Sequence, residues 1–411
     1  MAPKHRRAGG APRFSVVTVV RNEAARLPLL LASLREFRER GGEVLVLDTG
    51  SEDDTCEVAA AALCRVVREP KRFGGRLSAR QAEKIDAAFA RGGEAPLFAV
   101  GERLFHFARA REHAMSLARH DFQLAIDGGD QVDRIDVDFL DSVARSRKFG
   151  GMQFETRVRT TAGWSLEVRD RFCDRRAMRW RGRSHECLEP RTTGADLTIG
   201  ALSRDQLLVS HHSDLSKSRT YLLAGTALDA LAEPRMHRWR YFLARGLAAR
   251  GSFRSGLEVA LALDGPSVPP SVRSAALCFA ARCVAGSHGS LDGPLDGSLV
   301  GSKEQADALL FRAAVRDSSR RDPLLRLASR RLSEGDLQGA VSFASAALAV
   351  PARVSVSEPE ENFTTRPHGI LYWALLWLGR RDEAKVHFDT CRRLDPDNVE
   401  YAGHARLFVE R

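Results

Sequence analysis

The chain has 411 residues, of which 44% are hydrophobic and 28% are charged, and its formal net charge is +10. This length exceeds what a single core of ordinary size supports, so at least two domains are expected. No apolar run approaches the roughly 18–20 residues that cross a bilayer, which predicts a chain without a transmembrane segment. The basic start "MAPKHRRAGGAPR" lacks the apolar stretch of a signal peptide, and residues 1–12 are expected to form a disordered tail.

The net positive charge bears on which ligands the protein binds, and the cysteines bear on the cellular compartment in which it works. Basic residues are scattered along the chain and aromatic residues make up only 7% of it, a pattern that gives little support to nucleic-acid binding. A phosphate-bearing substrate explains the net positive charge as well as nucleic acid does. The seven cysteines are odd in number and form no CxxC pair, which predicts reduced thiols, a cytoplasmic protein and no zinc site.

The first half of the chain has the alternation of an α/β fold. β-branched and apolar runs predict buried strands at 13–20, 43–48 and 122–127, and helical spacing predicts helices at 23–41, 56–64 and 107–120. This order predicts a parallel sheet with right-handed crossovers. The segments from residue 148 to 190 have the pattern of antiparallel strands and turns.

The second half is predicted to be all helix, with a repeat. Three segments place a glycine in a turn and a small residue five positions later, which suits stacked helix hairpins of tetratricopeptide (TPR) type. An irregular helical bundle with coincidental glycines is the alternative. We therefore expect domains at 13–215 and 216–411, with a flexible loop near 286–302. The repeated pairs are Gly251 and Gly256, Gly335 and Ala340, and Gly379 and Ala384.

Polar side chains follow three of the predicted strands directly. In a parallel sheet, ligands bind beyond the carboxyl ends of the strands, so these positions are candidates for a site. Each group also has a structural interpretation, because such residues cap helices and shape turns. Their occurrence together favours a binding site. The groups are Arg21-Asn22-Glu23, Asp48 with Ser51, and Asp127-Gly128-Gly129-Asp130.

These segments resemble the GT-A domain of family 2 glycosyltransferases. The resemblance rests on "VVTVVRNEAARLPLLLASL", "EVLVLDTGSEDDTCEVA" and "RAREHAMSLARHDFQLAIDGGD", taken in that order. Downstream, "MRWRGRSHECLEP" and "SHHSDLSKSRTYLL" resemble elements of a subgroup in which the catalytic domain precedes tetratricopeptide helices. The implied fold is a GT-A nucleotide-sugar-binding domain with a Rossmann-like mixed sheet, followed by an all-α TPR-like domain.

The resemblance implies a transferase that takes a sugar from a nucleotide-diphosphate donor, a UDP-sugar first, with inversion and with help from Mn or Mg. It also implies that the acceptor is a peptide or protein bound by the repeats, or that the repeats form a homodimer. Asp127, Asp130 and His211 are the expected metal ligands, and Glu186 and His185 are the candidate acid–base residues, although a surface His-Glu pair is the alternative. The expected donor-binding residues are Val19, Arg21, Asn22, Glu23, Asp48, Ser51, Arg111 and Asp127.

The sequence departs from the family at one position. With the chains aligned on Asp127, Gly129 stands where the second metal-binding aspartate is expected, and Asp130 stands where glutamate is usual. Asp130 can take over the ligand role, because paired glycines let the backbone turn the carboxylate inward. In the alternative, the metal site is weakened and the protein is metal-independent or a non-catalytic scaffold that binds sugar nucleotides and uses its repeats for protein interaction.

Overall fold

The computed structural model divides the chain into two compact units, which are described separately. Residues 286–300 of the loop predicted near 286–302 lie outside the described residues, as do the domain boundary at 215/216 and most of the tail, so the predicted domain limits remain a proposal. The described residues are 10–160, 163–192, 197–212, 220–285, 301–351 and 358–408. The first unit comprises Met1–Ala90, Ala95–Arg159 and Glu167–Trp239, and the second comprises Arg91–Glu94, Thr160–Leu166 and Arg240–Arg411.

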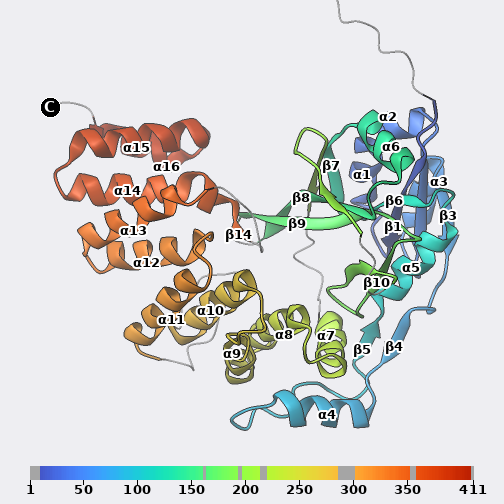
Figure 1. The fold of residues 1–411 in the computed structure, drawn as a ribbon, viewed down its shortest axis with the longest axis horizontal. Coiled ribbons are helices and arrows are strands. Elements are labelled where there is room, and N and C mark those ends of the chain that lie inside the picture. The colour runs from blue at the N-terminus through green and yellow to red at the C-terminus, as the bar shows by residue number, and fades with distance from the viewer. Residues whose placement is uncertain are drawn as a thin grey trace, which may run out of the picture. The chain divides into compact units, whose positions relative to one another are not determined.

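A mixed sheet with the strand order β3-β2-β1-β6-β9-β8-β13-β7 forms the centre of the first unit (Figure 1). β1 pairs in parallel with β2 and β6, and β2 pairs in parallel with β3, whereas β9 is antiparallel to β6. The predicted α/β fold with a mixed sheet is therefore confirmed. The strands are β1 (Phe14–Val20), β2 (Glu43–Asp48), β3 (Arg65–Arg68), β6 (Phe122–Asp127), β7 (Asp130–Ile135), β8 (Gly151–Thr160), β9 (Gly163–Asp174), β12 (Ile199–Ala201) and β13 (Leu207–His211).

Helices cover both faces of the parallel strands. Val16 belongs to a core with helices α1 (Leu27–Ser33), α2 (Arg35–Glu39), α3 (Thr55–Ala61) and α6 (Val137–Ser146). The next residue, Val17, belongs to a second core with α5 (Phe107–Leu117). Successive side chains of a strand point to opposite faces, so both faces of β1 are buried. This burial explains why the strands read as continuous apolar runs in the sequence.

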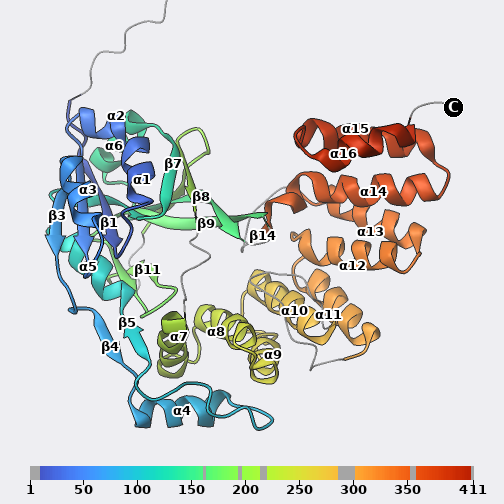
Figure 2. The same ribbon diagram turned by 180° about the vertical axis from the view of Figure 1, so that it is seen from behind.

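Shorter elements extend the first unit. β4 (Gly74–Arg76) and β5 (Arg103–Phe105) form an antiparallel pair on either side of α4 (Ala79–Phe89) in the sequence. α7 (Thr220–Ala232) contacts both α4 and β5. β10 (Met178–Arg181) and β11 (Cys187–Pro190) form a second antiparallel pair, and Figure 2 shows β11 from the opposite side.

The second unit consists mainly of helix hairpins. Gly251, Gly335 and Gly379 have φ angles of +89°, +81° and +77°, and each ends a helix whose partner follows at once. Glycine adopts this left-handed conformation without steric cost, which suits a tight hairpin turn. The helices are α8 (His237–Ala249), α9 (Phe253–Leu261), α10 (Pro270–Ala285), α11 (Lys303–Arg316), α12 (Asp322–Ser333), α13 (Leu337–Ala349), α14 (Thr365–Trp377), α15 (Arg381–Leu394) and α16 (Val399–His404).

The predicted small residues lie where the hairpins close. Ala340 and Ala384 are completely buried, and a Cβ atom added at Gly256 would lie 2.7 Å from the carbonyl oxygen of Ala244. The helices α12 and α13, and likewise α14 and α15, pack against each other (Figure 1). The predicted TPR-like repeat is confirmed, and the irregular bundle is not needed to explain the glycines. Among the described residues, no helix is both long and apolar enough to cross a membrane.

Candidate functional site

Hydrogen bonds tie the loop after β1 to the loop after β2. The backbone N–H of Asn22 donates to Ser51 Oγ at 2.9 Å, and Asn22 Oδ1 accepts from the backbone N–H of Glu52 at 2.8 Å. The N–H of Glu23 donates to Thr55 Oγ1 at 2.8 Å. Asn22 has a φ of +53°, a strained conformation for a residue with a side chain, and such strain is frequent at functional sites. The structure therefore brings the first two predicted groups together.

Asp48 shapes the turn that follows β2. Its side chain is completely buried, and its Oδ1 accepts from the backbone N–H groups of Ser51 at 2.8 Å and Gly50 at 3.3 Å. Gly50 has a φ of +109°, which favours glycine at this turn. Asp48 therefore orders this turn, and its contact with a nucleotide base stays a prediction.

Val19 and Arg21 lie on either side of the end of β1. Val19 pairs with Leu47 of β2 on one side and with Asp127 of β6 on the other. The guanidinium of Arg21 lies 3.5 Å from the carboxylate of Glu52, in a partly exposed position. Val19 thus places the end of β1 directly beside the carboxylate pair of the β6–β7 turn.

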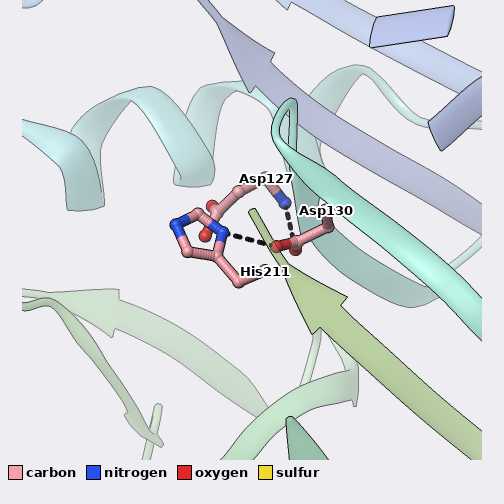
Figure 3. A group of neighbouring side chains, drawn as sticks. All are labelled: Asp127, Asp130 and His211. Atoms are coloured by element: carbon pink, nitrogen blue, oxygen red, sulfur yellow. Dashed lines mark hydrogen bonds and ion pairs between the residues drawn. The ribbon is translucent and has the colours of Figure 1, made fainter. Parts of the chain in front are cut away.

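Asp127, Asp130 and His211 form one cluster at the carboxyl end of β6 (Figure 3). Asp127 ends β6, Asp130 begins β7, and His211 of β13 is the register partner of Asp130. One ligand atom from each of the three residues lies within 4.8 Å of the others. Asp130 accepts from the N–H of Asp127 at 2.8 Å and lies 2.7 Å from His211 Nδ1. The three residues predicted as metal ligands are therefore neighbours.

The two glycines of the turn lie in crowded positions. A Cβ atom at Gly128 would lie 3.0 Å from side-chain carbons of Glu23 and Val20, and one at Gly129 would lie 3.2 Å from the carbonyl oxygen of His212. The carbonyl of Gly129 accepts the N–H of His212 at 2.9 Å. Glycine is therefore favoured here because the backbone is approached closely, and the turn leaves Asp130 almost completely buried.

Three arginines surround Asp127. Arg111 of α5 donates to Oδ1 at 2.5 Å, and Arg171 of β9 donates to Oδ2 at 2.8 Å. Arg169, two residues earlier on the same face of β9, lies 3.4 Å from Oδ2. Burial opposes ionisation of Asp127, but Arg171, Arg111 and Arg169 hold the pKa of this carboxyl well below its usual range. Asp127 is therefore a carboxylate at neutral pH, and both of its oxygens are bonded to arginine.

Arg111 also binds Glu186. Its Nε donates to Glu186 Oε1 at 2.6 Å, and its guanidinium carbon lies 5.0 Å from the centre of the Trp180 ring. Burial raises the pKa of Glu186, but Arg111 and Arg171 outweigh this effect and lower it below the ordinary value. Glu186 is therefore ionised and fixes the orientation of Arg111, and its role as a base stays a prediction.

His185 is separate from the group of potential metal ligands. Within the described residues, that group consists of Asp127, Asp130 and His211. His185 has a φ of +52°, and its carbonyl oxygen accepts from Arg238 Nε at 2.9 Å. The strained backbone marks the turn between β10 and β11, and an acid–base role for the imidazole stays a prediction.

Arg169 and Arg171 contact Asp127 and were not predicted from the sequence. The signal was present, because "RDR" places two arginines on one face of a predicted strand. What the sequence could not show is that β9 lies next to β6, with Phe172 opposite Leu124. That pairing carries the arginines to the strand that ends in Asp127.

Residues 15–84 match the family model of glycosyl transferase family 2. No curated protein sequence matches the chain. Among solved structures, TarS of S. aureus is similar, with 13% identity, a TM-score of 0.34, and coverage of 74% of this chain and 53% of that one. A thermophilic TPR protein of Thermus thermophilus, TTC0263, shows 20% identity, a TM-score of 0.30, and coverage of 45% and 89%. Glucosyl-3-phosphoglycerate synthase of Mycobacterium tuberculosis, solved with Mn²⁺ and UDP-glucose, shows 20% identity, a TM-score of 0.23, and coverage of 36% and 44%.

These structural similarities are distant, so the architecture rests on the strand order and the hairpins described above. The family match covers β1, α1, α2, β2, α3, β3, β4 and the start of α4, including the Asp48 turn. The predicted resemblance to family 2 glycosyltransferases is therefore confirmed over residues 15–84, and the helix hairpins of the second unit are TPR-like.

Proposed function

We propose that the chain transfers a sugar from a nucleotide-diphosphate donor, a UDP-sugar first, to an acceptor with inversion at the sugar carbon. The observation that carries this proposal is the Asp127–Asp130–His211 cluster. It lies at the carboxyl end of a parallel strand, where ligands of such sheets bind, and in the domain that carries the family match.

The donor set of the cluster fits a divalent cation. Two carboxylates and one imidazole suit Mn, and the carboxylate oxygens suit Mg. Asp127, Asp130 and His211 would hold the cation, which would neutralise the negative charge of the leaving diphosphate. Arg111 and Arg171 would bind diphosphate oxygens with their planar forks.

The acceptor needs a base that removes its proton as the sugar is transferred. Glu186 is our candidate for this base, with His185 as an acid–base partner. Arg111 would then connect the proposed metal and diphosphate site with the proposed base, because it contacts both Asp127 and Glu186. The TPR-like repeats would hold a peptide or protein acceptor, or pair with a second copy of the chain.

A specific observation favours a second candidate function. Both oxygens of Asp127 are already bonded to arginines, and Gly129 replaces the family's second aspartate. In this second candidate, Arg111, Arg169 and Arg171 would bind the diphosphate of a sugar nucleotide without a cation. The chain would then be a non-catalytic sugar-nucleotide-binding scaffold whose repeats contact other proteins.

Thermal unfolding of the full chain with UDP-, GDP- and dTDP-sugars, each with and without Mn, tests donor binding, because a ligand of the native state raises Tm. Hydrolysis of the best donor then separates the two functions. We expect Mn-dependent release of the nucleotide that is lost in Asp130→Asn and kept in Asp205→Asn, an exposed acid close to the start of β13. Binding without any turnover would support the scaffold, and binding of none of the donors would refute both functions.

A further inference from the structure

A cavity of about 450 Å³ lies in the first unit, between the start of α5, strand β10 with the turn that follows it, and the end of α7. Small-molecule sites commonly measure roughly 300–1,000 Å³, so this cavity has the size of a binding site. No residue of the Asp127–Asp130–His211 cluster lines it. Its charged and titratable lining includes His106, Arg109, Arg183, Glu112, Asp229 and Glu233.

Two arginines lie close to His106 at the start of α5. Arg109 belongs to the first turn of the helix, and its backbone N–H donates to His106 Nδ1 at 3.3 Å. Arg183 follows β10, and its carbonyl oxygen accepts from the N–H of Phe107, the first residue of α5, at 2.8 Å. Burial lowers the pKa of His106 to about 4, and repulsion by Arg183 and Arg109 adds to this fall. His106 is therefore neutral at pH 7 and lies in a positive field.

Both guanidinium groups have donors for a ligand. Arg109 is exposed, and among the described residues its guanidinium forms no hydrogen bond or ion pair. Arg183 Nη1 donates to Asp229 Oδ1 at 2.6 Å, but a guanidinium carries about five N–H donors in all. The N-terminus of α5 adds a positive partial charge. Paired N–H donors match the oxygens of phosphate, so this wall has the chemistry of a phosphate site.

The carboxylates of the lining already bind arginines. Glu112 Oε2 accepts from Arg191 at 2.7 Å, and Glu233 Oε1 accepts from Arg181 Nε at 2.9 Å, while Asp229 is paired as described above. These arginines offset the repulsion between the acids and an anion. An ionised carboxylate has about four lone-pair sites, so each acid can still accept a hydrogen bond from a hydroxyl group. The rest of the cavity therefore suits a ligand that carries hydroxyl groups.

We propose that this cavity binds a small molecule with a phosphate group on a hydroxyl-bearing body, which is the chemistry of a sugar phosphate. The phosphate would lie beside His106, where Arg109 and Arg183 approach it from two elements, α5 and the β10–β11 turn. The hydroxyl groups would face the three carboxylates of the lining. The proposal does not rest on glycosyl transfer, because neither the metal cluster nor a sugar nucleotide enters it.

Isothermal titration calorimetry and thermal unfolding of the full chain with glucose 6-phosphate and with glycerol 3-phosphate test the proposal. Glucose and inorganic phosphate, at the same ionic strength, separate the contributions of the body and of the charge. We expect saturable binding of at least one ester with a rise in Tm, and weaker binding of glucose and of inorganic phosphate. No saturable binding of either ester, or binding of glucose or inorganic phosphate as tight as that of the esters, would overturn the proposal.

Variants locate the bound ester. Arg109→Gln removes an exposed guanidinium of the lining and should weaken binding by about tenfold or more. Arg80→Gln removes the same charge from an exposed position of α4 and should leave the Kd unchanged. Ala232→Trp at the exposed end of α7 fills the cavity without a change of charge and should also weaken binding. Unchanged affinity in either cavity variant would show that the ester binds elsewhere.

UDP separates this cavity from the proposed donor site. UDP in excess should leave the affinity for the ester unchanged, and Arg109→Gln should leave the affinity for UDP unchanged. Displacement of the ester by UDP would place it at Arg111 and Arg171 and would overturn the proposal. A chain that binds the ester but no nucleotide would refute the proposed donor and support this cavity as a separate site.

Discussion

Asp130 and His211 face each other across the antiparallel pair β7–β13, with 2.7 Å between Asp130 Oδ1 and His211 Nδ1. The histidine is 81 residues away in the sequence and comes from the last strand before the helical part. The Asp-Gly-Gly-Asp turn alone supplies two carboxylates as potential metal ligands, and His211 adds an imidazole nitrogen as the third.

Replacing His211 by alanine should weaken cation binding. The change removes the nitrogen ligand and the contact of Asp130 Oδ1 with His211, and we expect the Kd for Mn to rise by about tenfold or more. Titration of Mn, followed by electron paramagnetic resonance, measures this without any sugar donor. His212→Ala is the matched control and should keep the wild-type affinity. The assignment of His211 as a metal ligand is wrong if His212→Ala weakens Mn binding and His211→Ala does not, or if neither variant alters the affinity.

Arg171→Gln should change cation and nucleotide binding in opposite directions. Arg171 donates to Asp127 Oδ2 and competes with a cation for this carboxylate, so its removal should tighten Mn binding. The same change removes a guanidinium proposed for the diphosphate, so the Kd for UDP should rise by about tenfold. Calorimetric titrations with Mn and with UDP give the two values. Arg204→Gln, which breaks an exposed pair with Glu155, is the control. A fall in both affinities would indicate a merely structural arginine.

Glu186→Gln separates a base from a positioning residue. The amide keeps the shape of the side chain and can still accept a hydrogen bond from Arg111, but it does not remove a proton. If Glu186 is the base, sugar transfer should slow by about 100-fold or more while the Kd for UDP stays within about twofold. Glu189→Gln on β11, an acid paired with Arg179 and Arg181, is the control. A parallel loss of UDP affinity would show instead that Glu186 acts by orienting Arg111.

Gly129→Asp tests why glycine stands at this position. The added Cβ would lie 3.2 Å from the carbonyl oxygen of His212, and the new carboxylate would lie in a turn that already holds two acids. We expect a loss of stability of about 1–3 kcal/mol. Gly129→Ala separates the steric part, because it adds the Cβ without charge. Chemical denaturation measures both variants. An Asp variant as stable as the wild type would mean that close packing does not exclude the family's residue.

The sequence predicted β1, β2 and β6 because these strands are buried on both faces and read as apolar runs. It did not predict β3, whose Arg65 and Arg68 are exposed. It also predicted that Asp127, Asp130 and His211 would meet, although only the resemblance pointed to His211. The arginines at 169 and 171 were missed because their contact depends on which strands are neighbours. Strand order is a tertiary property, and the spacing "RDR" alone is equally consistent with a solvated face.

The sequence also does not show why each repeat position needs a glycine, because glycine meets two different physical requirements in the repeats. Gly335 and Gly379 were expected in turns, and their positive φ angles explain them. Gly256 lies inside α9 and has no positive φ angle. Glycine is favoured there because the backbone of Ala244 leaves no room for a Cβ atom. Sequence spacing indicated a small residue there, but only the structure shows how little room is left.

Gly256→Ala should therefore destabilise the helical unit although alanine is the better helix former. Its Cβ would lie 2.7 Å from the carbonyl oxygen of Ala244, so α8 and α9 must move apart, at a cost of about 1–3 kcal/mol. Gly369→Ala in α14 is the matched control, because a Cβ there has no neighbour within 4 Å. It should leave stability unchanged or raise it by up to about 1 kcal/mol through helix propensity. Thermal unfolding monitored by circular dichroism compares the two. A stabilising effect of both would show that propensity outweighs packing at Gly256 and that the hairpin tolerates a wider separation.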